Sequence, residues 1–209
     1  MVYPIGKIVF PLIINNWIRK VNGLGNVPKD IAFIAAANHA SYIDHFVIMC
    51  TLIPYLNRKI HHLAKKEHFD NIFKKIWHTY AGAVPLDRQA RGKEALKWAI
   101  AALKQGKIIG IHPEGTRSLD GKLQKARTGI TRLALAAKVP VVPIGLIGTF
   151  EIMPKGKYIP KLKKATINIG KPLYFNKYYN KNITKKLLRE VTNDIMKEIA
   201  KLSHQRYNF

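Results

Sequence analysis

The sequence has a single cysteine, Cys50, so the chain can form no internal disulfide. A chain of this kind is typical of a reducing compartment. It also has no second cysteine and no HExxH motif to support a zinc site. We therefore expect no structural zinc site, and nothing else in the sequence implies a metal or a tightly bound cofactor.

Long apolar runs are also missing. A membrane-spanning helix needs about 20 consecutive apolar residues, and the longest charge-free runs, 31–43 and 45–57, contain polar residues. Residues 8–18 are mostly apolar, but Pro11, Asn15 and Asn16 interrupt them and no cleavage site for a secretory signal follows. We expect no membrane-spanning anchor.

Acidic residues are scarce, with 12 Asp and Glu against 36 Lys and Arg, which gives a formal net charge of +24. Such a charge predicts an anionic partner, which is a nucleic acid, an acidic carrier protein or an anionic membrane surface. Charge alone does not choose among these, and a lysine-rich soluble protein without such a partner is the alternative. No nucleic-acid-binding motif is recognisable, so we expect no nucleic acid.

The N-terminal segment has apolar residues at helical spacing and cations at its edges. This pattern predicts an amphipathic helix over residues 1–20 that contacts a membrane, followed by a single domain over residues 21–209. An ordinary helix packed on the core is an equally good interpretation. The apolar positions are Ile5, Ile8, Val9, Leu12 and Ile13.

The rest of the chain alternates short apolar runs with amphipathic segments, which is typical of an α/β domain. The predicted strands cover 31–37, the region of 63–64, 83–86, 107–111, 139–147 and, as an edge strand, 165–169. The predicted helices cover 42–53, ended by Pro54, then 67–80, 92–105, 128–138 and 184–205.

His39 and Asp44 follow the first predicted strand. On one helix they would point about 140° apart, so they can meet only if His39 lies in a loop and Asp44 in the first helical turn. Asp44 would then hold one ring nitrogen, and the other would take a proton from a substrate alcohol. Alternatively, Ser41 and Asp44 form a capping box in which the carboxylate binds a backbone amide.

A second motif, Glu114-Gly115-Thr116-Arg117-Ser118, follows another predicted strand. Arg117 and Arg88, which also follows a strand, can converge at the carboxyl edge of the sheet and bind a phosphate. The alternative for each is a surface salt bridge. Glu114 would orient Arg117 or bind an acceptor hydroxyl, and the backbone at Gly115 would donate to substrate.

Four blocks in order resemble the glycerolipid acyltransferase family, which includes the 1-acylglycerol-3-phosphate acyltransferases. They span residues 31–150. The blocks are Asn38-His39, Ser41 and Asp44; Gly82 with Arg88; Pro113 to Ser118; and Val139-Pro140-Val141-Val142-Pro143. His112 departs from the family pattern, which has an aromatic residue before Pro113.

The resemblance implies a mixed, mostly parallel sheet flanked by helices, as in glycerol-3-phosphate acyltransferases. It implies His39 as the general base with Asp44 supporting it. It places the acceptor-binding residues at Arg88, Glu114, Gly115, Thr116 and Arg117, and the fourth block near the acyl chain or in a structural role.

We therefore expect an O-acyltransferase that moves a fatty acyl group from acyl-CoA or acyl-carrier protein to a lysophosphatidate-like acceptor, giving phosphatidate for phospholipid synthesis. It would bind peripherally to the cytoplasmic face of the cell membrane. Another lysolipid or glycerol phosphate as acceptor is the nearest alternative. A basic nucleic-acid- or membrane-binding protein without catalysis is the alternative of a different class.

Overall fold

The computed structural model describes residues 6, 15–65, 70–80, 82–86, 93–179 and 181–209. Its centre is one sheet with the strand order β1-β7-β6-β2-β5-β3-β4, in which every pair is parallel except β6 with β7. The predicted mixed, mostly parallel sheet is confirmed. The strands are β1 Ile18–Asn22, β2 Ile34–Ala37, β3 Ile60–Lys65, β4 Ala83–Leu86, β5 Ile108–Ile111, β6 Val141–Ile147 and β7 Ala165–Ile169.

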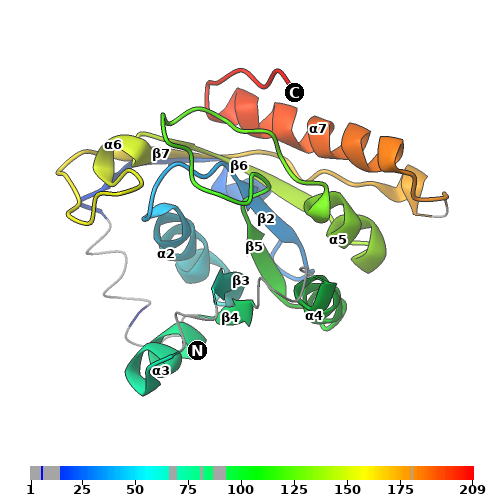
Figure 1. The fold of residues 1–209 in the computed structure, drawn as a ribbon, viewed down its shortest axis with the longest axis horizontal. Coiled ribbons are helices and arrows are strands. Elements are labelled where there is room, and N and C mark those ends of the chain that lie inside the picture. Colours follow the sequence, from blue (N-terminus) through cyan, green and yellow to red (C-terminus); the bar gives the residue numbers. More distant parts are fainter. Residues whose placement is uncertain (1–5, 7–14, 66–69, 81, 87–92, 180) are drawn as a thin grey trace.

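Helices cover both faces of this sheet (Figure 1). They are α2 Asp44–Leu56, α3 Ile72–Tyr80, α4 Lys93–Lys104, α5 Gly129–Ala137, α6 Thr149–Ile152 and α7 Lys185–Leu202, with short 3-10 turns at Leu24–Asn26 and Asn176–Tyr178. Within the described residues, none of these helices is both long enough and apolar enough to cross a bilayer.

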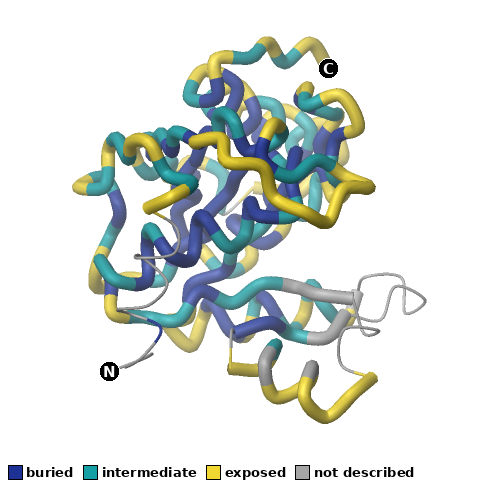
Figure 2. Tube along the Cα trace, turned by 90° about the vertical axis from the view of Figure 1, so that its left-hand side faces the viewer, coloured by how far each residue is buried: buried dark blue, intermediate teal, exposed yellow. Residues whose placement is uncertain are grey.

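The central strand β2 shows why the core has two halves. Its side chains alternate between the faces, so Ala35 and Ala37 pack in the cluster that contains α2, while Ile34 and Ala36 pack in the cluster that contains α4, α5 and α7. Both faces are buried, which explains why the strand reads as an unbroken apolar run. Figure 2 shows this buried interior running through the molecule.

Helix α2 differs from its prediction at its end. Pro54 lies inside the helix, which continues to Leu56. The proline falls in the last turn, so it removes one hydrogen bond there without interrupting turns further on. The end is made instead by Asn57, which adopts φ 52° and donates its N–H to the Ile53 carbonyl at 2.8 Å.

The sequence did not predict β1, and this changes two further predictions. Strand β7 is no edge strand, because β1 pairs with it in parallel through Ile18–Asn22. Residues 18–20 therefore lie in a strand and not in the predicted N-terminal helix. Of the rest of that predicted helix, residues 1–5 and 7–14 lie outside the described residues, and the expected boundary at residue 20 falls inside β1.

Candidate active site

The first and third sequence blocks meet at one edge of the sheet. Strands β2 and β5 are parallel neighbours, with Ala36 opposite Ile111. Their carboxyl ends therefore open on the same edge, where His39 follows β2 and His112 directly follows β5. This is the edge at which α/β sheets place their ligands.

His39 and Asp44 are in direct contact. Nδ1 of His39 lies 2.8 Å from Oδ2 of Asp44, and the Asp44 side chain is fully buried while that of His39 is 14% exposed. In a neutral ring, a carboxylate partner at Nδ1 favours the tautomer with the proton on Nδ1 and the lone pair on Nε2, which has no partner within the described part of the chain.

The same Asp44 oxygen also organises the backbone. Oδ2 accepts the N–H of Ala40 at 2.8 Å and of Ser41 at 2.7 Å. The carboxylate therefore makes the contacts that both interpretations of the motif require of it, since it binds backbone amides before α2 and contacts the imidazole. Helix α2 itself begins after Ile43, without a side-chain cap. The loop folds around Asp44 to make these hydrogen bonds, and this conformation holds His39 at the edge of the sheet.

Two polar residues of the first block anchor the loop on either side of His39. The Asn38 amide donates to the Leu146 carbonyl at 3.0 Å and accepts the Leu146 N–H at 2.7 Å, in β6. The Ser41 hydroxyl donates to the Met153 carbonyl at 2.7 Å. Residues 141–143 of the fourth block lie in β6, which pairs with β2 and, through Leu146 beyond the block, binds the loop that carries His39.

Glu114 is buried against this loop. Its Oε1 accepts the His39 N–H at 2.7 Å and its Oε2 accepts the Gln124 N–H at 2.8 Å, and the residue is 3% exposed. Burial raises the pKa of Glu114 to about 7. Since both oxygens bind backbone amides, the geometry favours a role in positioning His39 over the expected contact with an acceptor hydroxyl.

The remaining residues of the third block differ in exposure, since Ser118 is buried at 1% and Arg117 is partly exposed. Gly115 and Thr116 are exposed, and Gly115 has φ +73°, where a Cβ would come within 3.0 Å of Nε of Arg127. The Arg117 guanidinium lies 3.6 Å above the Tyr42 ring, a contact that the sequence did not suggest. No salt bridge of Arg117 is found among the described residues. Arg88 lies outside them.

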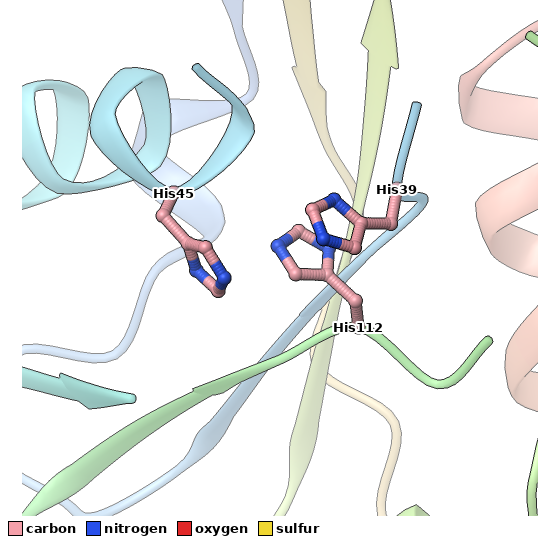
Figure 3. Close-up of side chains that lie close together, drawn as sticks. All are labelled: His39, His45 and His112. Atoms are coloured by element: carbon pink, nitrogen blue, oxygen red, sulfur yellow. The ribbon is translucent and has the colours of Figure 1, made fainter. Parts of the chain in front are cut away.

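Further histidines surround His39, and sequence reasoning missed their grouping. The His112 ring stacks on that of His39, with the ring centroids 3.9 Å apart and an angle of 8° between the ring planes. Nδ1 of His112 donates to the Ala37 carbonyl at 2.9 Å. His45 lies in the first turn of α2, and its ring centroid is 4.4 Å from that of His112 and 4.9 Å from that of His62 in β3. Figure 3 shows His39, His45 and His112. No motif marks His45 or His62, and only the missing aromatic residue marked His112.

Burial keeps these neighbours neutral. It lowers the pKa of His112 to about 3 and that of His62 to about 4, and it holds the pKa of His45 well below 6.5. These three imidazoles are therefore neutral at neutral pH.

A cavity of about 550 Å³ lies behind the loop. Asn38 and Ala40 line it together with residues of the C-terminal tail, but His39, Glu114 and Arg117 do not. It is therefore separate from the edge where the histidine and the arginine lie.

The fold and the site define an α/β protein with a histidine–carboxylate pair at the carboxyl edge of its sheet. The family model described as Acyltransferase matches residues 18–147 of the chain. With most of its described sheet and the whole site inside that match, the chain belongs to the acyltransferase family, as the four blocks predicted.

Individual relatives agree. The chain is 34% identical over 155 residues to the 1-acyl-sn-glycerol-3-phosphate acyltransferase of Bacillus subtilis, covering 74% of this chain and 73% of that one. It is 31% identical over 161 residues to a chloroplastic enzyme of the same name from Arabidopsis thaliana, of which it spans only 44%. The crystal structure of the 1-acyl-sn-glycerophosphate acyltransferase of Thermotoga maritima matches with a TM-score of 0.73 and 28% identity, covering 98% of this chain and 78% of that one.

The neutral histidines predict acid sensitivity. As the pH falls through 6.5, unfolded chains take up a proton at His62, whereas folded chains do so only near pH 4. The contribution of the buried, neutral His62 to the unfolding free energy is thus fully present above pH 6.5. It is lost as the pH falls toward 4, by up to about 1.4 kcal/mol per pH unit. Urea unfolding between these limits, with a chelator present, should show a shallower pH dependence for His62→Phe than for the wild type. Equal slopes would contradict the burial of a neutral imidazole.

Proposed function

We propose that the protein is a 1-acylglycerol-3-phosphate O-acyltransferase, which acylates the free hydroxyl of lysophosphatidate from an acyl thioester. The observation that carries the proposal is the contact of Nδ1 of His39 with Asp44, which leaves Nε2 as a base at the edge of the sheet. The names of the Bacillus subtilis relative and of the Thermotoga maritima structure support the choice of acceptor.

In this mechanism, Nε2 of His39 takes the proton of the acceptor hydroxyl as its oxygen attacks the thioester carbonyl. Asp44 stabilises the imidazolium that forms, because its buried carboxylate already accepts the Nδ1 proton. The tetrahedral intermediate then collapses, the C–S bond breaks, and the thiolate leaves and takes the proton back from His39. The acceptor is its own nucleophile, so the mechanism needs no covalent acyl-enzyme.

Arg117 is the proposed contact for the acceptor phosphate. Its guanidinium is fixed by stacking on Tyr42, in the loop that carries His39. A planar guanidinium binds phosphate oxygens in pairs, and pre-ordering on an aromatic ring lowers the cost of doing so. Arg88 would add a second cation, and the exposed backbone at Gly115 and Thr116 would supply N–H donors.

The donor is proposed to be acyl-CoA or acyl-carrier protein, since both present an anionic surface next to the thioester. A net charge of +24 attracts either one, and this attraction weakens as salt rises.

The direct test is lysophosphatidate-dependent thiol release from a fatty acyl-CoA or an acyl-carrier protein. We expect thiol release by the wild type. In His39→Ala the rate of release should fall by at least about a thousandfold, because the general base is lost and Asp44 no longer has an imidazole to support. Arg132→Ala, on the exposed side of α5, is the matched control and should retain activity. Acceptor-dependent release that His39→Ala leaves unchanged would contradict the mechanism.

We also propose that the protein binds peripherally to an anionic membrane through the segment 153–164. Three large apolar side chains there are exposed, namely Tyr158 at 78%, Ile159 at 84% and Leu162 at 87%. Exposed lysines surround them at positions 155, 157, 161, 163 and 164. Apolar side chains enter the interface and each lysine gains roughly 1 kcal/mol near anionic lipid.

This segment is joined to the proposed base. Its first residue, Met153, accepts both the Ser41 hydroxyl and the Tyr42 N–H, and the Tyr42 ring lies 5.4 Å from that of Tyr158. Helix α3, which exposes Ile72, Phe73 and Ile76, lies on the same left-hand side of Figure 1. Docking through the segment would thus bring a lipid acceptor to His39.

Sedimentation with vesicles that contain an anionic phospholipid tests the docking surface. We expect the double variant Ile159→Ser/Leu162→Ser to bind at least about tenfold more weakly than the wild type, because two apolar side chains no longer enter the bilayer. The matched control is Tyr174→Ser/Ile183→Ser, which removes two exposed apolar side chains elsewhere. Equal binding by the two double variants would show that the segment is not the docking surface.

A further inference from the structure

Three imidazoles converge beside the proposed base. His39 comes from the loop after β2, His45 from the first turn of α2, and His112 from the end of β5 (Figure 3). One ring nitrogen from each lies within 4.8 Å of the corresponding nitrogen of the other two. The acyl-transfer mechanism uses only the first of the three as a base, so it leaves the other two nitrogens without a chemical role.

Two of these rings are held as metal ligands usually are. Nδ1 of His39 binds the carboxylate of Asp44 at 2.8 Å, and Nδ1 of His112 binds the Ala37 carbonyl at 2.9 Å. A carboxylate or carbonyl behind one nitrogen fixes the tautomer and presents the lone pair of the other. In both rings the lone pair is therefore on Nε2.

The lone pair of His112 has no other use within the described residues. The residue is only 8% exposed, and its buried Nε2 has no hydrogen-bond partner there. An unpaired buried acceptor is destabilising unless it gains a partner. Negative charge is also close, because Asp44 is fully buried behind His39 and its Oδ1 is unpaired as well.

We propose that His39, His45 and His112 form a binding site for one divalent transition-metal ion of the zinc class, and that the bound ion stops acyl transfer. Imidazole is a preferred ligand of Zn²⁺, Co²⁺, Ni²⁺ and Cu²⁺, and three histidines with one open position suffice for Zn²⁺. The ion is an inhibitor and not a cofactor, because it takes the Nε2 lone pair with which His39 would accept the hydroxyl proton. This consequence rests on the proposed function, whereas the binding site does not.

Binding requires a small movement of the rings. Zn–N bonds of about 2.0–2.1 Å place two ligand nitrogens about 3.3 Å apart, so the widest separation of 4.8 Å has to close. The ion must also lie near the plane of each ligand ring, which the parallel stack of His39 on His112 does not allow. Rotation of one ring opens the stack, and His39 is the more accessible of the two.

The binding test uses the metal-free full-length protein and Co²⁺, whose visible absorption reports imidazole coordination. We expect saturation at one equivalent in the wild type. His45→Phe keeps a ring against His62 and His112 but removes one ligand, and it should weaken binding by more than about tenfold. The control His61→Phe removes a half-buried imidazole of β3 that lies outside the cluster and should bind Co²⁺ as the wild type does.

The inhibition test measures phosphatidate formation, since Zn²⁺ also binds the released thiol. Zn²⁺ should inhibit the wild type and His61→Phe, a chelator should restore both, and His45→Phe should resist. Wild-type-like Co²⁺ binding by His45→Phe, or none by the wild type, would overturn the site. Full activity of metal-loaded wild type would overturn the inhibition. Absence of acyl transfer in metal-free protein would count against the proposed function alone, because the Co²⁺ spectrum still decides the site.

Discussion

The site depends on one buried oxygen, Oδ2 of Asp44. It accepts the imidazole of His39 and the backbone amides of Ala40 and Ser41, all at 2.7–2.8 Å. A fully buried carboxylate is costly unless hydrogen bonds compensate it. The loop therefore closes around Asp44 because the charge needs these donors, and the closed loop is what orients His39. The same contacts of Asp44 therefore stabilise the loop and orient the proposed base.

Sheet topology brings the other parts to this loop. The neighbours of β2 are β5 and β6, which lie far along the chain, and each sends one anchor to the loop. Glu114, after β5, accepts the His39 N–H, and Leu146, in β6, exchanges two hydrogen bonds with Asn38. Blocks that are separate in the sequence become one unit because parallel strands end at a common edge. Glu114 and Leu146 thus position the loop, and in the proposed mechanism Arg117, which stacks on the Tyr42 ring, contacts the acceptor.

Sequence reasoning reached the sheet, most of its strands and the His39–Asp44 contact, because periodicity and a strand–loop–helix order constrain these locally. It missed β1, since a short, half-exposed strand such as Ile18–Asn22 has no clear alternation and exists through its pairing with β7. It did not predict the contacts of Glu114 with the His39 and Gln124 amides, because the chain does not show which amides a carboxylate will meet in the fold. The grouping of His45 with His62 was not predicted for the same reason, since the packing of α2 against β3 brings their ring centroids within 4.9 Å of each other.

The most direct test of the account is the tautomer of His39. Long-range ¹H–¹⁵N correlation spectra of protein labelled at histidine, assigned by the loss of one signal in His39→Gln, report which ring nitrogen carries the proton at neutral pH. We expect the proton on Nδ1 in the wild type, and loss of this preference in Asp44→Asn, because Asp44 accepts that proton. A wild-type His39 with its proton on Nε2 would contradict the account, since no lone pair would remain there for the acceptor hydroxyl.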